Sequence, residues 1–140
     1  MGVNLSVKHV IIDNRKILLQ IWDLASDNQF EFLLPSYARG TSGAIFMYDI
    51  TNEQSLFRLK TLYDLFENAL RGATPFPIVI VVGSKIDLKD ERKISERNVI
   101  EMFSTKQIYK FLECSPKTGE NVNLVFSTLL NRVIDQLNVK

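Results

Sequence analysis

The sequence predicts an α/β domain in three layers, with a mostly parallel sheet and one antiparallel hairpin at its edge. Apolar, often β-branched segments alternate with segments whose apolar residues recur every three or four positions. Such alternation of strands and helices is typical of parallel sheets covered by helices. A length of 140 residues fits one domain over residues 1–140.

The first two strands are predicted within residues 3–22. Residues 3–7 alternate apolar and polar side chains, as a half-buried strand does, and Val10–Ile12 extends the apolar pattern. Ile17–Trp22 is a second apolar segment, and the polar, turn-forming residues Asp13–Lys16 separate the two. Two strands joined by a short polar turn predict an antiparallel hairpin.

The next part of the chain is less regular before it returns to a strand. Asp23–Gly40 allows a helix on either side of Pro35, but not smoothly through it. Ala44–Tyr48 predicts a buried strand that ends at Asp49. Thr51–Gln54 then has the spacing of a capping box, a hydroxyl followed three residues later by Gln, and predicts the start of a helix.

The second half of the chain repeats strand and helix. Residues spaced by three and four form the apolar face of the helix after the capping box: Leu56, Leu59, Tyr63, Phe66 and Leu70. Gly72 ends this helix, and the β-branched run Ile78–Val82 predicts a strand covered on both faces. Ser95 is placed to cap a helix that reaches about Lys106. Its inward residues are Val99, Met102 and Phe103.

A short strand and a long helix complete the pattern. Phe111–Cys114 predicts the last strand of the sheet. The final helix is predicted from an apolar face made of Val122, Phe126, Leu129, Leu130, Val133 and Leu137. In parallel sheets ligands bind beyond the carboxyl ends of the strands. The places to look for a site are therefore residues 23–27, 49–52, 83–87 and 115–117.

Composition excludes several classes of protein. The net charge is +1 with no basic stripe, which argues against nucleic acid as a partner. The apolar run Ile78–Val82 is too short to cross a bilayer. Cys114 is the only cysteine, so an internal disulfide is excluded and a reducing cytoplasm is expected. His9 is the only histidine, which argues against a Ser-His-Asp triad and against a multi-histidine metal site. We expect His9 to be an ordinary strand residue.

Four segments in register carry a family resemblance. Leu19–Asp23 resembles LQIWD of the pattern LQIWDTAGQ, and Ser36–Asn52 resembles SYYRGAxGAIxVYDxTN. Gly83–Leu88 resembles the loop that contains NKxD, and Glu113–Val122 resembles ETSAKTGxNV. The chain therefore resembles the Ras superfamily of small GTPases over nearly its whole length, the Rab branch in particular. The resemblance implies a P-loop-NTPase-like fold and binding of GTP or GDP.

The resemblance assigns a guanine-binding site to the loops after the last two strands. By that resemblance the site comprises Ser84, Lys85, Asp87, Ser115, Pro116 and Lys117. A carboxylate such as Asp87 accepts two N–H bonds from the Watson–Crick edge of guanine, and a site of this kind discriminates strongly. The aliphatic stems of Lys85 and Lys117 can flank the base and its ribose. The alternative for Asp87 is a turn or helix-cap residue.

The sequence also departs from the family at positions that contact nucleotide. By resemblance, Asp23 and Ser26 lie in the segment that contacts phosphate and is called switch II, the second switch, and Ser26 replaces a glycine of that segment. Asp27 stands at the water-orienting position in place of glutamine, so no catalytic residue is intact. Ser84 replaces the asparagine of NKxD. Pro116 replaces an alanine whose N–H donates to guanine O6, and proline has no N–H.

The phosphate loop G-x-x-x-x-G-K-[ST] does not occur in this sequence. We expect a truncated domain without the first strand and first helix of the family, with weak or no GTP or GDP binding and with Mg²⁺ binding disfavoured. The leading hypothesis is a degenerate, non-hydrolysing relative that works as a regulatory or binding module. The alternative is a GTP-binding molecular switch, a GTPase in signalling or vesicle trafficking, whose amino-terminal phosphate-loop segment is missing from this sequence, so enzyme activity stays open.

Two further expectations concern surfaces. Aromatic and aliphatic residues of the second-switch region form either a partner surface or part of the core: Trp22, Phe30, Phe32, Leu33, Leu34 and Tyr37. The carboxyl terminus has no cysteine for a prenyl anchor, so no direct membrane anchor is expected. The resemblance implies that the missing first strand is central in the sheet of the family, so we expect its absence to leave two unpaired edges. We expect Ile17–Trp22 to close directly on Ala44–Tyr48; a strand-completing partner or dimer, or an unstable fragment, are the alternatives.

Overall fold

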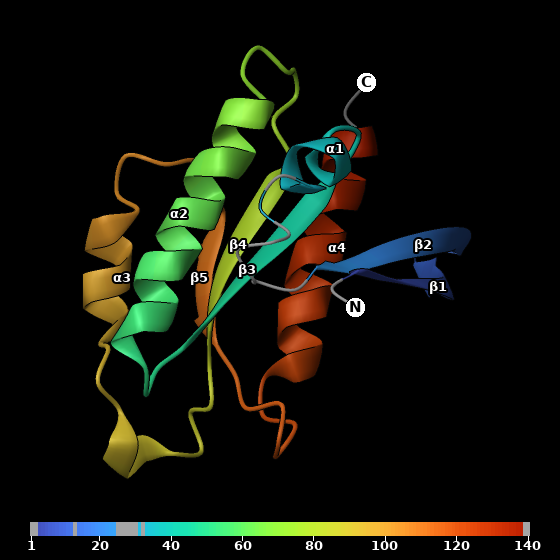
Figure 1. Ribbon diagram of the computed structural model, residues 1–140. Helices are drawn as coiled ribbons and strands as arrows, with labels where there is room; N and C mark the ends of the chain where they lie inside the picture. The colour runs from blue at the N-terminus through green and yellow to red at the C-terminus, as the bar shows by residue number, and fades with distance from the viewer. Residues whose placement is uncertain (1–2, 13, 25–30, 32, 139–140) are drawn as a thin grey trace.

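The computed structural model describes residues 3–12, 14–24, 31 and 33–138 (Figure 1). Its helices and strands, in chain order, are β1 Val3–Ile12, β2 Arg15–Leu24, α1 Leu34–Ala38, β3 Gly43–Asp49, α2 Glu53–Ala69, β4 Ile78–Ser84, the 3₁₀ turn η2 Lys89–Glu91, α3 Glu96–Met102, β5 Lys110–Glu113 and α4 Val122–Asn138. None of the described helices combines the length and the apolar character needed to cross a membrane.

The centre of the fold is a parallel sheet in the order β3-β4-β5. Helices α2 and α3 cover one face, and α4 covers the other (Figure 1). Every residue of β4 is buried, as its β-branched sequence predicts. On the α2 side the rings of Phe46 and Tyr63 meet edge to face at 5.4 Å. The predicted three-layer, mostly parallel α/β fold is confirmed.

The predicted antiparallel hairpin is confirmed, with longer strands than expected. Ile12 pairs with Arg15, so two residues of the expected turn belong to β2 and a two-residue loop remains. Asn14 in this loop has a φ of +65°, a conformation that asparagine tolerates better than most residues. His9 lies in β1 as predicted. The hairpin points away from the three-stranded sheet (Figure 1) and exposes large apolar side chains: Leu5, Val7, Ile11, Leu18 and Trp22.

The expected direct closure of β2 on β3 is wrong. Over the described residues, β1 and β2 form one sheet and β3, β4 and β5 form another, with no ladder between them. The end of β2 packs against α1 instead. Trp22 of β2 lies 5.0 Å from Tyr37 of α1 between ring centroids, so the hairpin contacts this helix and not β3. After β2, Glu31 forms an ion pair with Arg58 of α2.

The start of α2 differs from the predicted capping box. Asn52, not Thr51, is the N-cap: its side-chain oxygen accepts a hydrogen bond from the Gln54 N–H at 2.9 Å. The hydroxyl of Thr51 donates instead to Asp49 at 2.7 Å, and the Thr51 N–H donates to the same oxygen. A carboxylate is the stronger acceptor, so it holds Thr51 in the turn before the helix. The predicted buried face of α2 is confirmed.

The remaining helices differ in detail. Helix α1 begins just before Pro35, which lies in its first turn, where the missing N–H is not needed. Ser95 caps α3 as predicted, but the helix ends at Met102 because the chain must turn to enter β5. In α4 the row through Val125 and Leu129 faces the sheet, so the predicted inward residues Phe126 and Leu137 are 45% and 55% exposed.

Candidate functional site

The candidate site lies at the carboxyl ends of β4 and β5, at the lower end of the sheet in Figure 1. The loop after β4 carries Lys85 and Asp87, and the loop after β5 carries Ser115, Pro116 and Lys117. The Ile86 N–H donates to the Cys114 carbonyl at 3.3 Å and joins the two loops. The structure therefore brings these predicted guanine-binding residues together at the carboxyl ends of the strands, where parallel sheets bind their ligands.

Asp87 is oriented by a buried serine. The hydroxyl of Ser115 donates to Asp87 Oδ1 at 2.7 Å, and Ser115 itself is fully buried. The same hydroxyl oxygen accepts from the Thr118 N–H at 3.2 Å. Because Ser115 cannot rotate away from these two bonds, the carboxylate of Asp87 keeps a defined direction. A fixed carboxylate of this kind is suited to accept N–H donors from a planar base.

Lys85 combines a left-handed backbone conformation with an ion pair. Its φ is +69°, in the left-handed region that favours glycine, and its ammonium lies 2.8 Å from Asp49 Oδ2. Partial burial raises the pKa of the Asp49 carboxyl, but hydrogen bonds from Lys85 and Thr51 outweigh burial and lower that pKa overall. The bond to Asp49 in turn raises the pKa of Lys85.

Asp49 is a site residue that was not predicted individually. Its signal in the sequence is its position at the carboxyl end of β3, the same position that Ser84 holds at the end of β4. Its carboxylate links the ends of two strands: one oxygen binds Thr51 and the other binds Lys85. Only the tertiary structure pairs Asp49 with Lys85, because Asp49 ends β3 and Lys85 follows β4.

Ser84 has a structural bond within the sheet. It is buried, and its hydroxyl donates to the Tyr48 carbonyl at 2.9 Å, across from β4 to β3. The Ile50 N–H donates to the Ser84 carbonyl at 3.2 Å and continues the same connection. Burial raises the pKa of the Tyr48 phenol, since it disfavours the phenolate. Ser84 thus stabilises the strand end from which the site loop departs.

The loop after β5 is shaped by its backbone. Pro116 and Lys117 are exposed at its start. The Gly119 N–H donates to the Ser115 carbonyl at 2.7 Å, and Gly119 has a φ of +87°, which glycine adopts without steric cost. The Ser115 N–H donates to the Glu120 carbonyl at 2.9 Å and closes the turn. Pro116 has no N–H to offer in this turn.

The predicted phosphate positions are only partly described. Asp23 lies near the end of β2, where its backbone pairs with Asn4. Ser26 and Asp27 lie outside the described residues, so their predicted roles stay predictions. Within the described part of the chain, no group of three His, Cys, Asp or Glu side chains is placed to hold a metal ion.

The predicted partner surface is partly exposed and partly core. Trp22 is 44% exposed and contacts the half-buried Tyr37. Leu33 is also half-buried, and Leu34 packs against the core beneath α2. Two further members of this set, Phe30 and Phe32, lie outside the described residues. The structure therefore assigns Leu34 to core packing and leaves Trp22 at the surface.

Comparison with known proteins places these features in a family. The sequence profile of the protein family described as the Ras family matches residues 1–135. The chain is 33% identical over 140 residues to the Ras-related protein Rab-8B of Homo sapiens, covering all of this chain and 66% of Rab-8B.

Two other relatives match over a similar extent. The Ras-related protein RABC1 of Arabidopsis thaliana is 34% identical over 135 residues, which are 96% of this chain and 63% of RABC1. The Ras-related protein Rab-30 of Homo sapiens is 35% identical over 136 residues, which are 97% of this chain and 65% of Rab-30. The chain thus spans about two thirds of the length of these relatives. With its α/β fold and its strand-end loops, the chain belongs to the Ras family and is a Rab-like member of the small GTPases.

Proposed function

We propose that residues 1–140 form one small-GTPase-like domain that acts as a regulatory or binding module in cytoplasmic signalling, with weak or no binding of GTP or GDP. The observation that carries the proposal is Pro116, which begins the exposed part of the loop after β5 and has no N–H. By resemblance, this position donates a backbone hydrogen bond to the base. A base bound there leaves its carbonyl oxygen without that donor.

The ion pair between Lys85 and Asp49 supports the same proposal. The ammonium of Lys85 is engaged by Asp49 at 2.8 Å, so use of the Lys85 side chain by a base competes with that ion pair. The hydrogen bond missing at Pro116 joins a neutral N–H to a neutral carbonyl, and such a bond contributes about 0.5–1.5 kcal/mol. Since about 1.4 kcal/mol corresponds to a tenfold change in affinity, its loss weakens binding by up to about one order of magnitude.

Calorimetric titration with GDP and GTP in the presence of Mg²⁺ tests this proposal. We expect little or no heat of binding, and we expect Pro116→Ala to strengthen binding because it restores an N–H. Asp87→Asn should remove any remaining preference for guanine over adenine nucleotides. The control is Asp90→Asn. Asp90 is an exposed residue of the neighbouring 3₁₀ turn, so this substitution also removes one negative charge but leaves the bond between Ser115 and Asp87 intact. Tight binding by the unmodified chain would overturn the proposal.

A GTP-dependent switch is the second candidate. Its support is that Asp87, Ser115, Lys85 and Lys117 are present and gathered at one edge of the sheet. In this candidate a phosphate-binding segment and Mg²⁺ complete the site. Sequencing the complete transcript tests it. An upstream G-x-x-x-x-G-K-[ST] motif, together with GTP hydrolysis by the full product, would favour the switch over the degenerate module.

Protein partners are proposed at the second-switch region. The support is the exposed Trp22, packed on Tyr37 in a hairpin that also exposes Leu5, Val7, Ile11 and Leu18. We expect Trp22→Ala to reduce capture of a partner by the immobilised chain while the melting temperature changes little. Phe57→Ala is the matched control, because Phe57 is an exposed aromatic residue of α2. Equal losses for both variants would contradict a specific surface at Trp22.

A strand-completing partner or a dimer is proposed for the open edge of β3. Over the described residues, β3 pairs only with β4, and β2 pairs only with β1. Unpaired edges of this kind attract further strands. Size-exclusion chromatography with light scattering tests a dimer: we expect a mass above that of one chain, decreasing on dilution. A single-chain mass at all concentrations would leave only a different protein as the source of the strand.

A further inference from the structure

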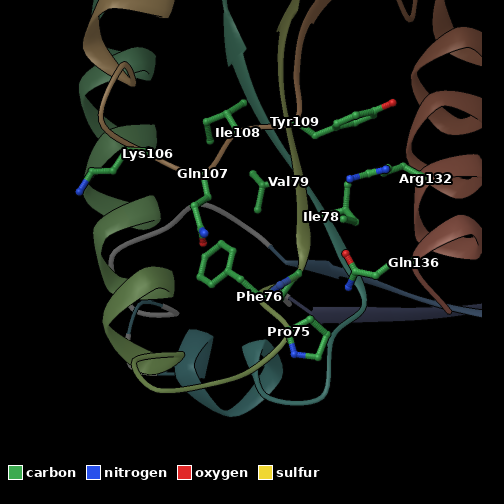
Figure 2. Close-up of a pocket in the computed structure, with 11 residues that line it drawn as sticks. Pro75, Phe76, Ile78, Val79, Lys106, Gln107, Ile108, Tyr109, Arg132 and Gln136 are labelled. Atoms are coloured by element: carbon green, nitrogen blue, oxygen red, sulfur yellow. The ribbon is translucent and has the colours of Figure 1, made fainter. Parts of the chain in front are cut away.

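A hollow lies at the end of the sheet opposite the candidate nucleotide site. It has a volume of about 410 Å³ and opens where the chain enters β4 and β5 (Figure 2). Its floor is apolar, formed by Ile78, Val79 and the ring of Phe76. Tyr109 and Arg132 form the wall on the α4 side, where Arg132 extends from the helix toward the strands (Figure 2).

The cations around this hollow differ in their partners. Lys106 points away from the hollow in Figure 2, and its ammonium lies 2.8 Å from Glu67. The guanidinium of Arg132 lies over the Tyr109 ring, 5.3 Å from its centroid, and forms no ion pair with any described residue. Lys110 approaches the same ring at 5.5 Å. No Asp or Glu lines the hollow. The hollow is therefore positive without a carboxylate of its own.

We propose that this hollow docks an acidic peptide segment of a partner protein, with a carboxylate on Arg132 and an adjacent apolar side chain over Phe76. A guanidinium packed over an aromatic ring loses side-chain freedom in advance, so it is better placed to bind a carboxylate through two parallel hydrogen bonds. Tyr109 is 40% exposed, so the guanidinium that lies over its ring can be reached from solvent. Charge complementarity together with the apolar floor identifies the partner as a peptide and not a bare anion.

The amides of the hollow add to the same chemistry. Gln107 and Gln136 line it from the loop before β5 and from α4, and each carries both a donor and an acceptor. Groups of this kind can pair with the backbone of an extended segment, which a phosphate ion does not have. The hollow is built from segments separate from the loops after β4 and β5, so docking there is independent of whether nucleotide binds.

Fluorescence anisotropy with a short labelled peptide that alternates Glu with Phe tests the proposal on the full chain. We expect saturable binding that weakens about tenfold or more in Arg132→Gln, because a charge-assisted pair is lost. The matched control is Arg97→Gln, which changes a highly exposed arginine of α3 far from the hollow. Tyr109→Leu should weaken binding as well, since it removes the stacking ring. Circular dichroism checks that each variant is folded.

Three results would overturn the proposal. The first is equal binding of the peptide by Arg132→Gln and by Arg97→Gln. The second is unchanged affinity when Gln replaces every Glu of the peptide, which would show that charge recognition is absent. The third is competition by inorganic phosphate or by vesicles containing phosphatidylserine that is as effective as the peptide itself, which would make the hollow a general anion site.

Discussion

Gly83 provides the sharpest test of how the site end of β4 is packed. A Cβ added at Gly83 would lie 2.7 Å from Tyr48 Oη, 2.8 Å from Tyr48 Cζ and 3.0 Å from Ile50 Cγ2. Tyr48 is 2% exposed and Ile50 is fully buried, so neither side chain can swing into solvent to make room. We therefore predict that Gly83→Ala is clearly destabilising.

The size of the effect follows from these contacts. Forcing an extra methyl group into a closely packed interior costs about 1–3 kcal/mol. For a chain of this length, each kcal/mol lowers Tm by about 3–4 °C. Urea denaturation followed by circular dichroism measures the loss, with an unchanged m-value showing that the folded state remains compact. The variant Tyr48→Phe in the same chain should recover part of the loss, because it removes the nearest atom, Oη.

Gly43 is the matched control for this prediction. A Cβ at Gly43 would meet Leu129 Cδ1 at 2.9 Å and Val133 Cγ2 at 3.1 Å, the ends of α4 side chains rather than a ring. Such side chains can shift by changing rotamer, so Gly43→Ala should cost less than Gly83→Ala. The reasoning is refuted if Gly83→Ala is as stable as the original chain, or if Gly43→Ala loses more stability.

Three further predictions concern single residues. Lys85→Gly should unfold at a higher urea midpoint than Lys85→Ala, since only glycine relieves the left-handed φ; the opposite order would contradict the strain. The lowered pKa of Asp49 contributes stability above its ordinary value of 3.8 that is lost as pH falls below it. The stability gap between the original chain and Asp49→Asn should therefore shrink in urea titrations from pH 5 to pH 3, and a constant gap would refute this. Tyr63 is buried, and burial raises the pKa of its phenol to about 12, while the nearby Gln107 backbone lowers that pKa without forming a hydrogen bond of good geometry with the hydroxyl. Tyr63→Phe should change the unfolding free energy by no more than about 1 kcal/mol, and a larger loss in thermal melts would show that the contact with the Gln107 backbone is a full hydrogen bond.

Local patterns predicted the elements well where one residue type dominates a segment. The run at Ile78–Val82 is a strand buried on both faces, and Ser95 caps its helix. Patterns failed where two neighbours competed for one role. Both Thr51 and Asn52 can cap α2, and the carboxylate of Asp49 decided between them by binding Thr51. Spacing alone also placed Phe126 inward, whereas the rotation of α4 on the sheet left it exposed.

The candidate site was predicted residue by residue but not pair by pair. Resemblance indicated Lys85, Asp87 and Ser115, and the bond from Ser115 to Asp87 agrees with a shared site. The ion pair of Lys85 joins it to Asp49, which was predicted only as part of the segment 49–52. Side chains on different strand-end loops meet only when the strands pair, so their partners depend on the sheet order.

The sequence by itself determined the alternation of strands and helices, the buried β4 and the family, because these rest on local periodicity and on motifs along the chain. Only the tertiary structure decided that β2 stays apart from β3, that Asp49 pairs with Lys85, and that Arg132 lies over the Tyr109 ring beside the apolar floor of the hollow. Each of these depends on contacts between residues distant in the sequence. Such contacts are selected by the packing and hydrogen bonding of the whole fold, which no local pattern encodes.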